Sequence, residues 1–223
     1  MLLDATDTGP YRNYAVPDDG AEPTPADINA LIAAFAERER KPRLEYLATV
    51  CPRVEPALLD AGFGVEARLP VLTCAPDDVV AATVDSPIEL VLASTDDELR
   101  LVAEAQNEAY GAPDATEHDA ARLRRTLDRD GLVALAVDTA TGIGVGAGLC
   151  TPPHRGVSEL AAVGVRTAYR RRGIAAALTS LLTRACPTVG INTPFLMAAG
   201  SAEERIYQRI GYRRVAESLH ISR

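Results

Sequence analysis

The sequence lacks the features that would place the chain in a membrane, in an oxidising compartment or around a metal ion. No apolar run in its 223 residues approaches the length of a bilayer-spanning helix, and the acidic N-terminus has no signal-peptide core. The four cysteines include no Cys-x-x-Cys pair, and the three histidines include no pair at metal-ligand spacing. We therefore expect a cytoplasmic protein with buried thiols, no metal and no membrane contact.

Positive charge is also scarce, which argues against a nucleic acid as the main partner. The formal net charge is -8, and Lys41 is the only lysine, a usage typical of a GC-rich bacterial genome. An acidic chain mildly favours cationic substrates. The two common nucleotide-binding signatures, G-x-x-x-x-G-K-[ST] and G-x-G-x-x-G, are both absent.

What the chain does have is enough apolar residues for a sizeable core. A hydrophobic content of 47% with 24% charged residues is typical of a globular protein. Turn-forming residues cluster at 75–87 and indicate a linker. The sequence therefore predicts a smaller N-terminal region, 1–80, and a larger domain, 86–223.

The stretch Glu159–Ala185 has the pattern of a strand, a basic turn and a helix. It begins with a short apolar run containing β-branched Val163 and Val165, which is typical of a buried strand, and crosses a basic turn to Gly173. Beyond the glycine, apolar residues recur at helical spacing and predict one buried face: Ile174, Leu178, Leu181, Leu182 and Ala185.

This layout is suited to binding an anion. A helix start leaves its first N–H groups unpaired and adds partial positive charge, while Gly173 and the small Ala175 let a ligand approach the backbone. The nearby arginines reverse the acidic charge of the chain locally: Arg166, Arg170, Arg171 and Arg172. A solvated surface cluster is the other interpretation, but the position at a helix start favours a phosphate site.

The remaining segments predict alternating strands and helices. Before the linker we expect a short strand, a helix, a strand, a helix and one or two strands: 11–16, 24–41, 44–50, 52–61 and 65–74. After it we expect a strand, two helices, a hairpin, the central stretch, a strand, a helix and a final strand: 88–93, 95–110, 116–130, 132–137, 143–150, 159–185, 193–198, 201–211 and 212–221. Capping boxes are expected at Thr24, Thr95 and Ser201.

These residues resemble a known family. Arg170 to Ala175 matches the Q/R-x-x-G-x-G/A acetyl-CoA signature of GNAT N-acetyltransferases, and Val163-Gly164-Val165 resembles the end of that family's fourth strand. Ile206 to Tyr212 is similar to the family's late Leu-Tyr-x-x-x-Gly-Phe motif, and the resemblance in element order covers about 88–223. One departure is Gly200, which stands where many members carry an asparagine near the pantetheine.

The resemblance implies a fold, a co-substrate and a set of site residues. The fold would be α/β, a mixed and mostly antiparallel sheet flanked by helices, with acetyl-CoA as co-substrate and no metal. The implied acetyl-CoA-binding residues lie on the strand, the basic turn and the helix start: Val163, Val165, Arg170, Arg171, Arg172, Gly173, Ile174 and Ala175. The implied catalytic residues are Tyr207 and Glu159.

The chemistry of acetyl transfer gives each catalytic residue a role. An alkylamine with a pKa of roughly 10 must lose a proton to attack a thioester, and Glu159, acidic within an apolar strand, is suited to accept it. The alternative is that Glu159 is an outward-facing strand residue bound to solvent or an arginine, and that a water relay or the substrate itself takes up the proton. Backbone N–H groups near Val163–Val165 would polarise the thioester carbonyl. Tyr207 is suited to protonate the departing sulfur; packing of its ring on the sheet is the alternative.

The N-terminal region contains a faint echo of the late motif. Glu55 to Phe63 aligns with Glu204 to Tyr212 when the Gly–aromatic pairs are superposed, with Leu58 in place of Tyr207. Nothing upstream of it resembles the basic turn. A partial, degenerate GNAT-like half and a chance match in an Ala/Leu-rich sequence are both open.

Two functions follow, an acetyl-CoA-dependent N-acetyltransferase and, as the alternative, a non-catalytic acyl-CoA-binding regulatory module. For the enzyme, the acceptor would be an amine on a small molecule or a peptide. It would be bound by the loop at 107–114 and the turn near His154, with Tyr110, Asp114 and Glu117 as candidate contacts. An exposed final strand would also allow a homodimer through edge pairing.

Overall fold

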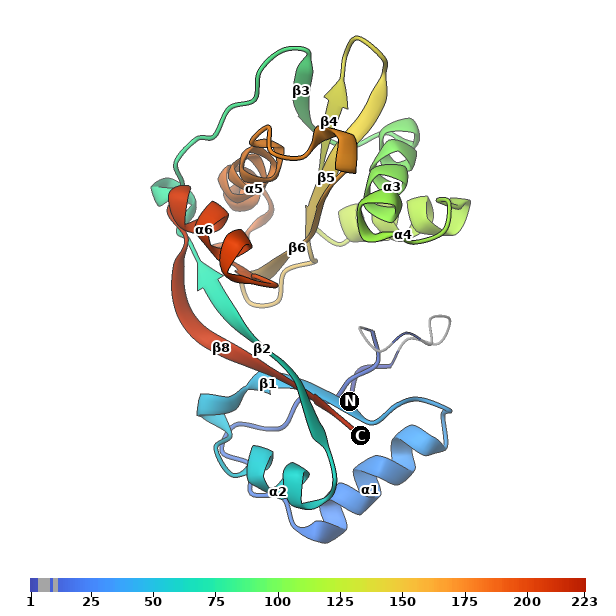
Figure 1. The fold of residues 1–223 in the computed structure, drawn as a ribbon, viewed down its shortest axis with the longest axis vertical. Coiled ribbons are helices and arrows are strands. Elements are labelled where there is room, and N and C mark those ends of the chain that lie inside the picture. Colours follow the sequence, from blue (N-terminus) through green and yellow to red (C-terminus); the bar gives the residue numbers. More distant parts are fainter. Residues whose placement is uncertain (4–8, 10–11) are drawn as a thin grey trace. The chain divides into compact units, whose positions relative to one another are not determined.

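The computed structural model describes residues 1–3, 9 and 12–223, which form two compact units. One unit comprises Met1–Val71 together with Val215–Arg223, and the other comprises Leu72–Arg214 (Figure 1). The C-terminal segment thus packs with the N-terminal region. The sequence-based division into a GNAT-like half at 1–80 and a domain at 86–223 is a statement about evolutionary origin. The compact units do not test it, and it stays a prediction.

The first unit is a small sheet with two helices. Its elements are α1, β1, a 3-10 turn, α2, most of β2 and most of β8: Pro25–Ala36, Arg43–Leu47, Ala48–Val50, Val54–Asp60, Gly64–Thr73 and Arg213–Ser222. Strand β1 pairs antiparallel with β8, from Arg43 opposite Ser222 to Leu47 opposite Ser218. The helices bury their apolar face on this sheet through a cluster that includes Ile28, Phe35 and Leu58.

The final strand is not at an edge of the sheet, and the expectation of an exposed final strand was wrong. The strand order is β1-β8-β2-β7-β6-β5-β4-β3, so β8 has a hydrogen-bonded neighbour on each side. On the β1 side the pairing covers Ser218–Ser222, so this half of β8 is not open to a strand from a second copy. A homodimer stays a prediction without this support.

The second unit places helices on both faces of a sheet. Its elements in chain order are a 3-10 turn, β3, α3, α4, β4, β5, β6, a second 3-10 turn, α5, a third 3-10 turn, β7 and α6: Pro76–Asp78, Ile88–Leu92, Asp96–Tyr110, Glu117–Leu127, Leu132–Asp138, Ile143–Cys150, Val157–Val165, Thr167–Tyr169, Ile174–Ala185, Cys186–Val189, Thr193–Met197 and Ser201–Arg209. Strands β3 to β6 pair antiparallel, and β6 pairs parallel with β7. The predicted fold class, a mixed and mostly antiparallel sheet flanked by helices, is confirmed.

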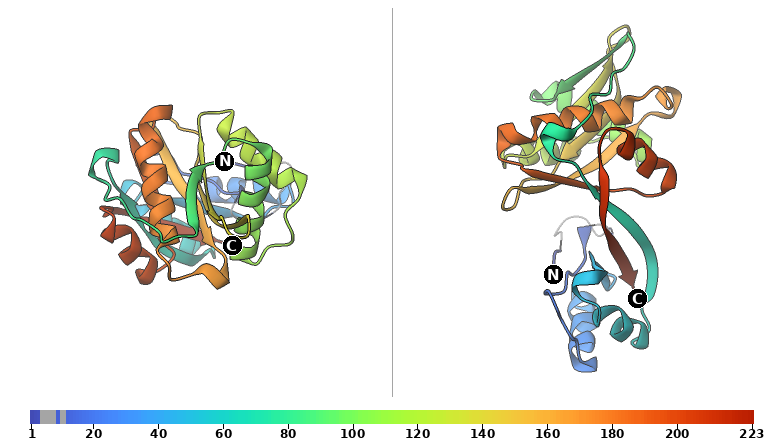
Figure 2. Two further views of the ribbon diagram at one scale, coloured as in Figure 1. Left: turned by 90° about the horizontal axis from the view of Figure 1, so that it is seen from above. Right: turned by 90° about the vertical axis from the view of Figure 1, so that its left-hand side faces the viewer.

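Alternation along the central strands sends side chains to the two faces of this sheet. On β4, Leu132 and Ala134 pack in the cluster that contains α5, whereas Val133 and Leu135 pack in the cluster that contains α3 and Leu123 of α4. Figure 2 shows α5 and α3 on opposite sides of the strands. The strands are therefore buried on both faces, which explains their nearly continuous apolar sequence.

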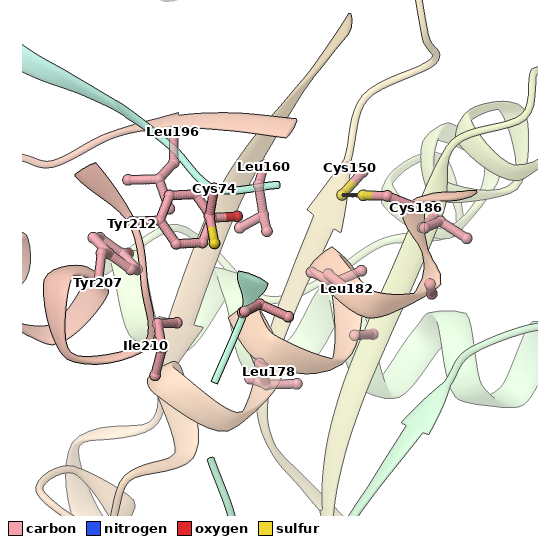
Figure 3. Packing of buried hydrophobic residues seen from close by; sticks show 14 of the residues in the cluster. Cys74, Cys150, Leu160, Leu178, Leu182, Cys186, Leu196, Tyr207, Ile210 and Tyr212 are labelled. Atoms are coloured by element: carbon pink, nitrogen blue, oxygen red, sulfur yellow. Dashed lines mark hydrogen bonds between the residues drawn. The ribbon is translucent and has the colours of Figure 1, made fainter. Parts of the chain in front are cut away.

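The cluster around α5 also receives α6 and the turn that follows it. Tyr207, Ile210 and Tyr212 lie near Leu160 of β6 and Leu196 of β7 (Figure 3). The thiols of Cys150 and Cys186 lie 3.9 Å apart in the same cluster. All four cysteines are free and buried, as the sequence predicts.

Local signals place most helix ends correctly. Thr24 and Thr95 form the expected capping boxes, with Asp27 and Glu98 respectively. The expected box at Ser201 was wrong: Gly200 is the N-cap, without a side-chain bond, and Glu203 instead accepts the Ala199 N–H at 2.9 Å.

Two predicted segments of the N-terminal region end clearly earlier than expected. Helix α1 ends at Ala36 rather than near Lys41, and the strand expected at 44–50 gives way to a 3-10 turn after Leu47. Part of the strand expected at 11–16 lies outside the described residues.

Within the part of the chain that the structure describes, no helix combines the length and apolar character needed to cross a membrane.

Candidate active site

The parallel strands β6 and β7 pair only at their beginnings. Their ladder runs from Val157 opposite Thr193 to Glu159 opposite Phe195 and continues no further. On the other side, the N–H of Arg166 donates to the Val145 carbonyl of β5 at 2.9 Å. Since successive peptide groups alternate, the carbonyls of residues 163 and 165 and the N–H of residue 165 point away from β5. The end of β6 thus presents an open backbone edge.

A bulge in β6 lies just before this edge. The pairing with β5 passes from Leu149 opposite Ala161 to Ala147 opposite Gly164, so β6 has one extra residue there. Ala162 takes up the irregularity with φ of 52°, an uncommon value for a residue with a side chain. The bulge separates the fully paired start of β6 from its open end.

The N-terminus of α5 supplies unpaired N–H groups next to the strand end. Gly173 is its N-cap, with a left-handed φ of 79° and no side-chain cap. Helices α1, α3 and α4 all begin with capping boxes. Without such a cap, the N–H groups around Ile174 and Ala175 are left for a bound anion.

The structure divides the four arginines of the basic turn into two pairs. Arg166 binds the Gly144 carbonyl at 2.6 Å and pairs with Glu108, while Arg170 donates to two backbone carbonyls, of Val165 and Ala109, each at 3.2 Å. Both of these side chains tie β6 to neighbouring elements.

The other two arginines are available for an anion. Within the described ranges, Arg171 and Arg172 are exposed and form no ion pair, and Arg172 stacks 5.0 Å from the centre of the Tyr169 ring. They line a cavity of about 330 Å³ together with the linker residues 84–88. A phosphate group would find two guanidinium groups without an ion-pair partner here, with Asp85 in the same lining.

Tyr207 presents a buried phenol from α6. The residue is 8% exposed, and its ring packs with a tilt against the ring of Tyr212, with centroids 6.2 Å apart (Figure 3). Burial raises its pKa, and the nearby Glu203 and Tyr110 raise it further. The hydroxyl has no hydrogen-bond partner among the residues that the structure describes, so it remains protonated and can donate to a ligand.

Glu159 occupies the last position of β6 that pairs with β7. Its N–H donates to the Thr151 hydroxyl at 3.1 Å, and its carbonyl accepts the Thr151 N–H at 2.9 Å. The side chain is half-buried and alternates with the buried Ser158 and Leu160, of which Leu160 packs toward α5. Glu159 therefore faces the side of the sheet that carries α3 and α4.

A second cavity, of about 520 Å³, lies at the end of α3 and along the following loop. Its lining is rich in carboxylates: Glu104, Asn107, Glu108, Gly111, Ala112, Pro113, Asp114, Ala115 and Arg166. The cavity lies along the loop that the sequence predicts as an acceptor site, and its lining includes Asp114 but not Tyr110; binding of an acceptor there stays a prediction. Of the other residues expected there, Glu117 pairs instead with Arg100 at 3.1 Å, and His154 forms a backbone bridge with Val157.

Glu104 and Glu108 were not predicted as site residues. Their spacing of four residues in a predicted helix would have indicated two carboxylates on one helix face. Their pairing with Arg166, which lies far away in the sequence, was not visible there. No group of three or more residues suited to hold a metal occurs within residues 1–3, 9 and 12–223.

Comparison with known proteins gives a family model and several solved structures. Residues 96–220 match the model described as "Acetyltransferase (GNAT) domain". A GCN5-related N-acetyltransferase from Kribbella flavida is 26% identical, with a TM-score of 0.79 over 97% of this chain and 83% of its own. No curated protein matches.

Two further structures are similar in fold. One is a GCN5-related N-acetyltransferase from Sphaerobacter thermophilus, 19% identical, with a TM-score of 0.68 over 89% of this chain and 68% of its own. The other is a tandem GNAT protein from the clavulanic acid biosynthesis pathway, 11% identical, with a TM-score of 0.67 over the same shares. At these identities the likeness concerns the fold alone.

Proposed function

The chain belongs to the GNAT acetyltransferase family, and from this we propose that it transfers an acetyl group from acetyl-CoA directly to an amine in a ternary complex. The observation that carries the proposal is the end of the β6–β7 ladder at Glu159. It leaves an open strand edge beside an uncapped helix start, and those two features suit the two ends of acetyl-CoA. GNAT-fold proteins use acetyl-CoA as co-substrate, and the residues present fit that ligand.

The phosphates of acetyl-CoA would bind at the basic turn. Arg171 and Arg172 have no carboxylate partners in the described part of the chain, and the N–H groups of Ile174 and Ala175 begin α5 without a cap. Gly173 keeps the approach open, since an added Cβ would meet only the Thr83 carbonyl, at 3.6 Å. Charge-assisted hydrogen bonds of this kind favour a phosphate strongly.

The thioester would lie along the open edge of β6. The N–H of Val165 points away from β5, and we place the carbonyl oxygen of the thioester within reach of N–H groups at Val163–Val165. Fixed backbone donors stabilise the negative charge that develops on that oxygen. Negative charge on the departing sulfur is then relieved by a proton from the buried hydroxyl of Tyr207.

The amine must lose a proton before or during attack. Glu159 is the proposed base, acting directly or through a water relay, because a half-buried carboxylate on β6 can accept that proton. The acidic lining of the cavity at 107–114 would attract a protonated amine, whether it belongs to a small molecule or to a peptide. Direct attack needs no covalent enzyme intermediate, so no cysteine has a part in this mechanism.

The N-terminal region is proposed to be a degenerate GNAT-like half that binds no acetyl-CoA. Gly62 and Gly211 both have positive φ, of 83° and 104°, and each precedes a buried aromatic residue. The number of residues from Gly62 to Gly211 is also the number from the start of β2 to the start of β8, and from the end of β2 to the end of β8. One acetyl-CoA per chain is therefore expected.

Isothermal titration with acetyl-CoA tests the proposal. We expect micromolar binding at one site, weaker binding of dephospho-CoA, and weaker binding by the Arg171→Ala, Arg172→Ala double variant, which leaves Arg170 and its backbone contacts in place. A panel of amines, with Tyr207→Phe as the low-activity reference, then separates the enzyme from a regulatory module that binds acyl-CoA without turnover. Absence of acetyl-CoA binding would contradict both readings.

A further inference from the structure

The open edge of β6 is occupied by side chains of the same unit. The hydroxyl of Tyr110 donates to the Val163 carbonyl at 3.1 Å, and Nε of Arg170 donates to the Val165 carbonyl at 3.2 Å. A second nitrogen of Arg170 binds the Ala109 carbonyl at 3.2 Å, next to Tyr110. Both carbonyls that point away from β5 thus already have a donor.

These two carbonyls are the hydrogen-bond acceptors that the pantetheine arm of acyl-CoA would use on this strand edge. The pantetheine arm contains two secondary amides, and an extended chain with amide N–H groups pairs with an open strand edge as an added strand would. Such an N–H must come within about 3 Å of the carbonyl oxygen, on the same open side. The hydroxyl of Tyr110 and an amide of the arm therefore compete for Val163.

The end of α3 holds Tyr110 tightly over the strand. A Cβ added to Gly164 would lie 2.8 Å from Cβ of Ala109 and 3.2 Å from Cε2 of Tyr110, so only glycine permits this approach. Two independent contacts therefore bring the phenol to the strand, the hydrogen bond to Val163 and the packing on Gly164.

Tyr110 is nevertheless able to leave. It is 62% exposed and is the last residue of α3, followed by Gly111 in the left-handed conformation with φ of 66°. Its ring can rotate toward solvent without crossing the packed core. The single hydrogen bond from its hydroxyl to the Val163 carbonyl contributes only a modest net free energy, so another donor can replace it.

Resting on the proposed function, we propose that Tyr110 is a gating residue of the acetyl-CoA site. Its hydroxyl holds the Val163 carbonyl in the free chain and yields it to an amide N–H of the pantetheine arm. Arg170 links this gate to the other end of the ligand, since it lies in the proposed phosphate-binding turn and holds both Val165 and the end of α3. Acetyl-CoA therefore binds more weakly than the site would allow without the gate.

Titration of the Tyr110→Phe variant tests the gate. Phenylalanine keeps the ring over Gly164 and removes only the hydroxyl, so acetyl-CoA should bind about two- to ten-fold more tightly, the factor expected for one hydrogen bond. Adenosine 3′,5′-bisphosphate has the adenosine, the 3′-phosphate and one of the two 5′-phosphates of CoA without the arm, and its affinity should not change.

Tyr46→Phe is the matched control. Tyr46 belongs to the first unit, and its buried hydroxyl has no hydrogen-bond partner among the described residues. The same chemical change there should leave the affinity for both ligands unaltered.

The remaining outcomes would overturn either the gate alone or the gate together with the proposed function. Unchanged or weaker acetyl-CoA binding by Tyr110→Phe would overturn the gate while leaving the proposed function intact. Equal tightening for adenosine 3′,5′-bisphosphate would also overturn it, because the effect would then lie in the phosphate site. Failure of the unaltered protein to bind acetyl-CoA would overturn the proposed function and the gate with it.

Discussion

Gly164→Ala should weaken the second unit because α3 and β6 meet there without room for a methyl group. The new Cβ would lie 2.8 Å from Cβ of Ala109, whereas carbon atoms ordinarily approach to about 3.5–4.0 Å. Ala109 is fixed to the helix backbone, so α3 or β6 must move by about 1 Å. Tyr110, at 3.2 Å, can give way by rotating.

Overpacking of this kind costs about 1–3 kcal/mol. In a protein of this size the loss corresponds to a decrease of about 2–12 °C in Tm, measured by calorimetry or circular dichroism. Gly64→Ala is the matched control, because an added Cβ at Gly64 meets no atom within 4 Å. Its Tm should stay close to that of the unaltered protein.

A double variant isolates the contact. Ala109→Gly alone should cost about 1 kcal/mol of helix propensity. Combined with Gly164→Ala, it removes the overlap, so the double variant should be less destabilised than the sum of the two single changes. Additive effects, or an unchanged Tm for Gly164→Ala, would refute the tight approach of α3 to β6.

Three further changes test other parts of the structure. Tyr207→Phe should lower kcat by about 10²–10⁴-fold with little change in acetyl-CoA affinity; an unchanged kcat would remove Tyr207 as the acid. Thr183→Val leaves the buried hydroxyl of Tyr212 without its 2.7 Å partner and should cost about 1–3 kcal/mol in urea unfolding, whereas a cost near zero would count against that bond. Burial, together with the guanidinium of Arg43 at 3.1 Å, lowers the pKa of His220. Stability is then complete above the unfolded pKa of about 6.5 and decreases as pH falls below it, and His220→Gln should flatten this dependence between pH 5 and 8.

The sequence was sufficient for features that depend on neighbouring residues. A threonine followed three residues later by Asp27 or Glu98 fixes the start of α1 or α3, because the capping bonds close within one turn. The period of apolar residues fixes the buried face of α5 in the same way. The basic turn and Gly173 were recognisable for this reason too.

Where a local pattern failed, a non-local contact or a small shift was the cause. Ser201 has the right spacing to Glu204 for a capping box, yet the helix begins one residue earlier than that pattern requires, and Glu203 binds the Ala199 N–H instead. The arginines illustrate the same limit. Of four similar residues in one cluster, two are held by contacts within the protein, and only the positions of Glu108 and of the Val165 and Ala109 carbonyls distinguish them.

The amino-acid sequence by itself determined the family, the element order and the candidate residues of the donor site. The tertiary structure alone decided that β6 and β7 part after Glu159, that β8 has a neighbour on each side, and that Tyr110 lies on Val163. The physical reason is the range of the interactions. Caps and periodic faces are formed within a few residues, whereas strand order and the partners of a backbone carbonyl depend on segments brought together by packing across the whole core.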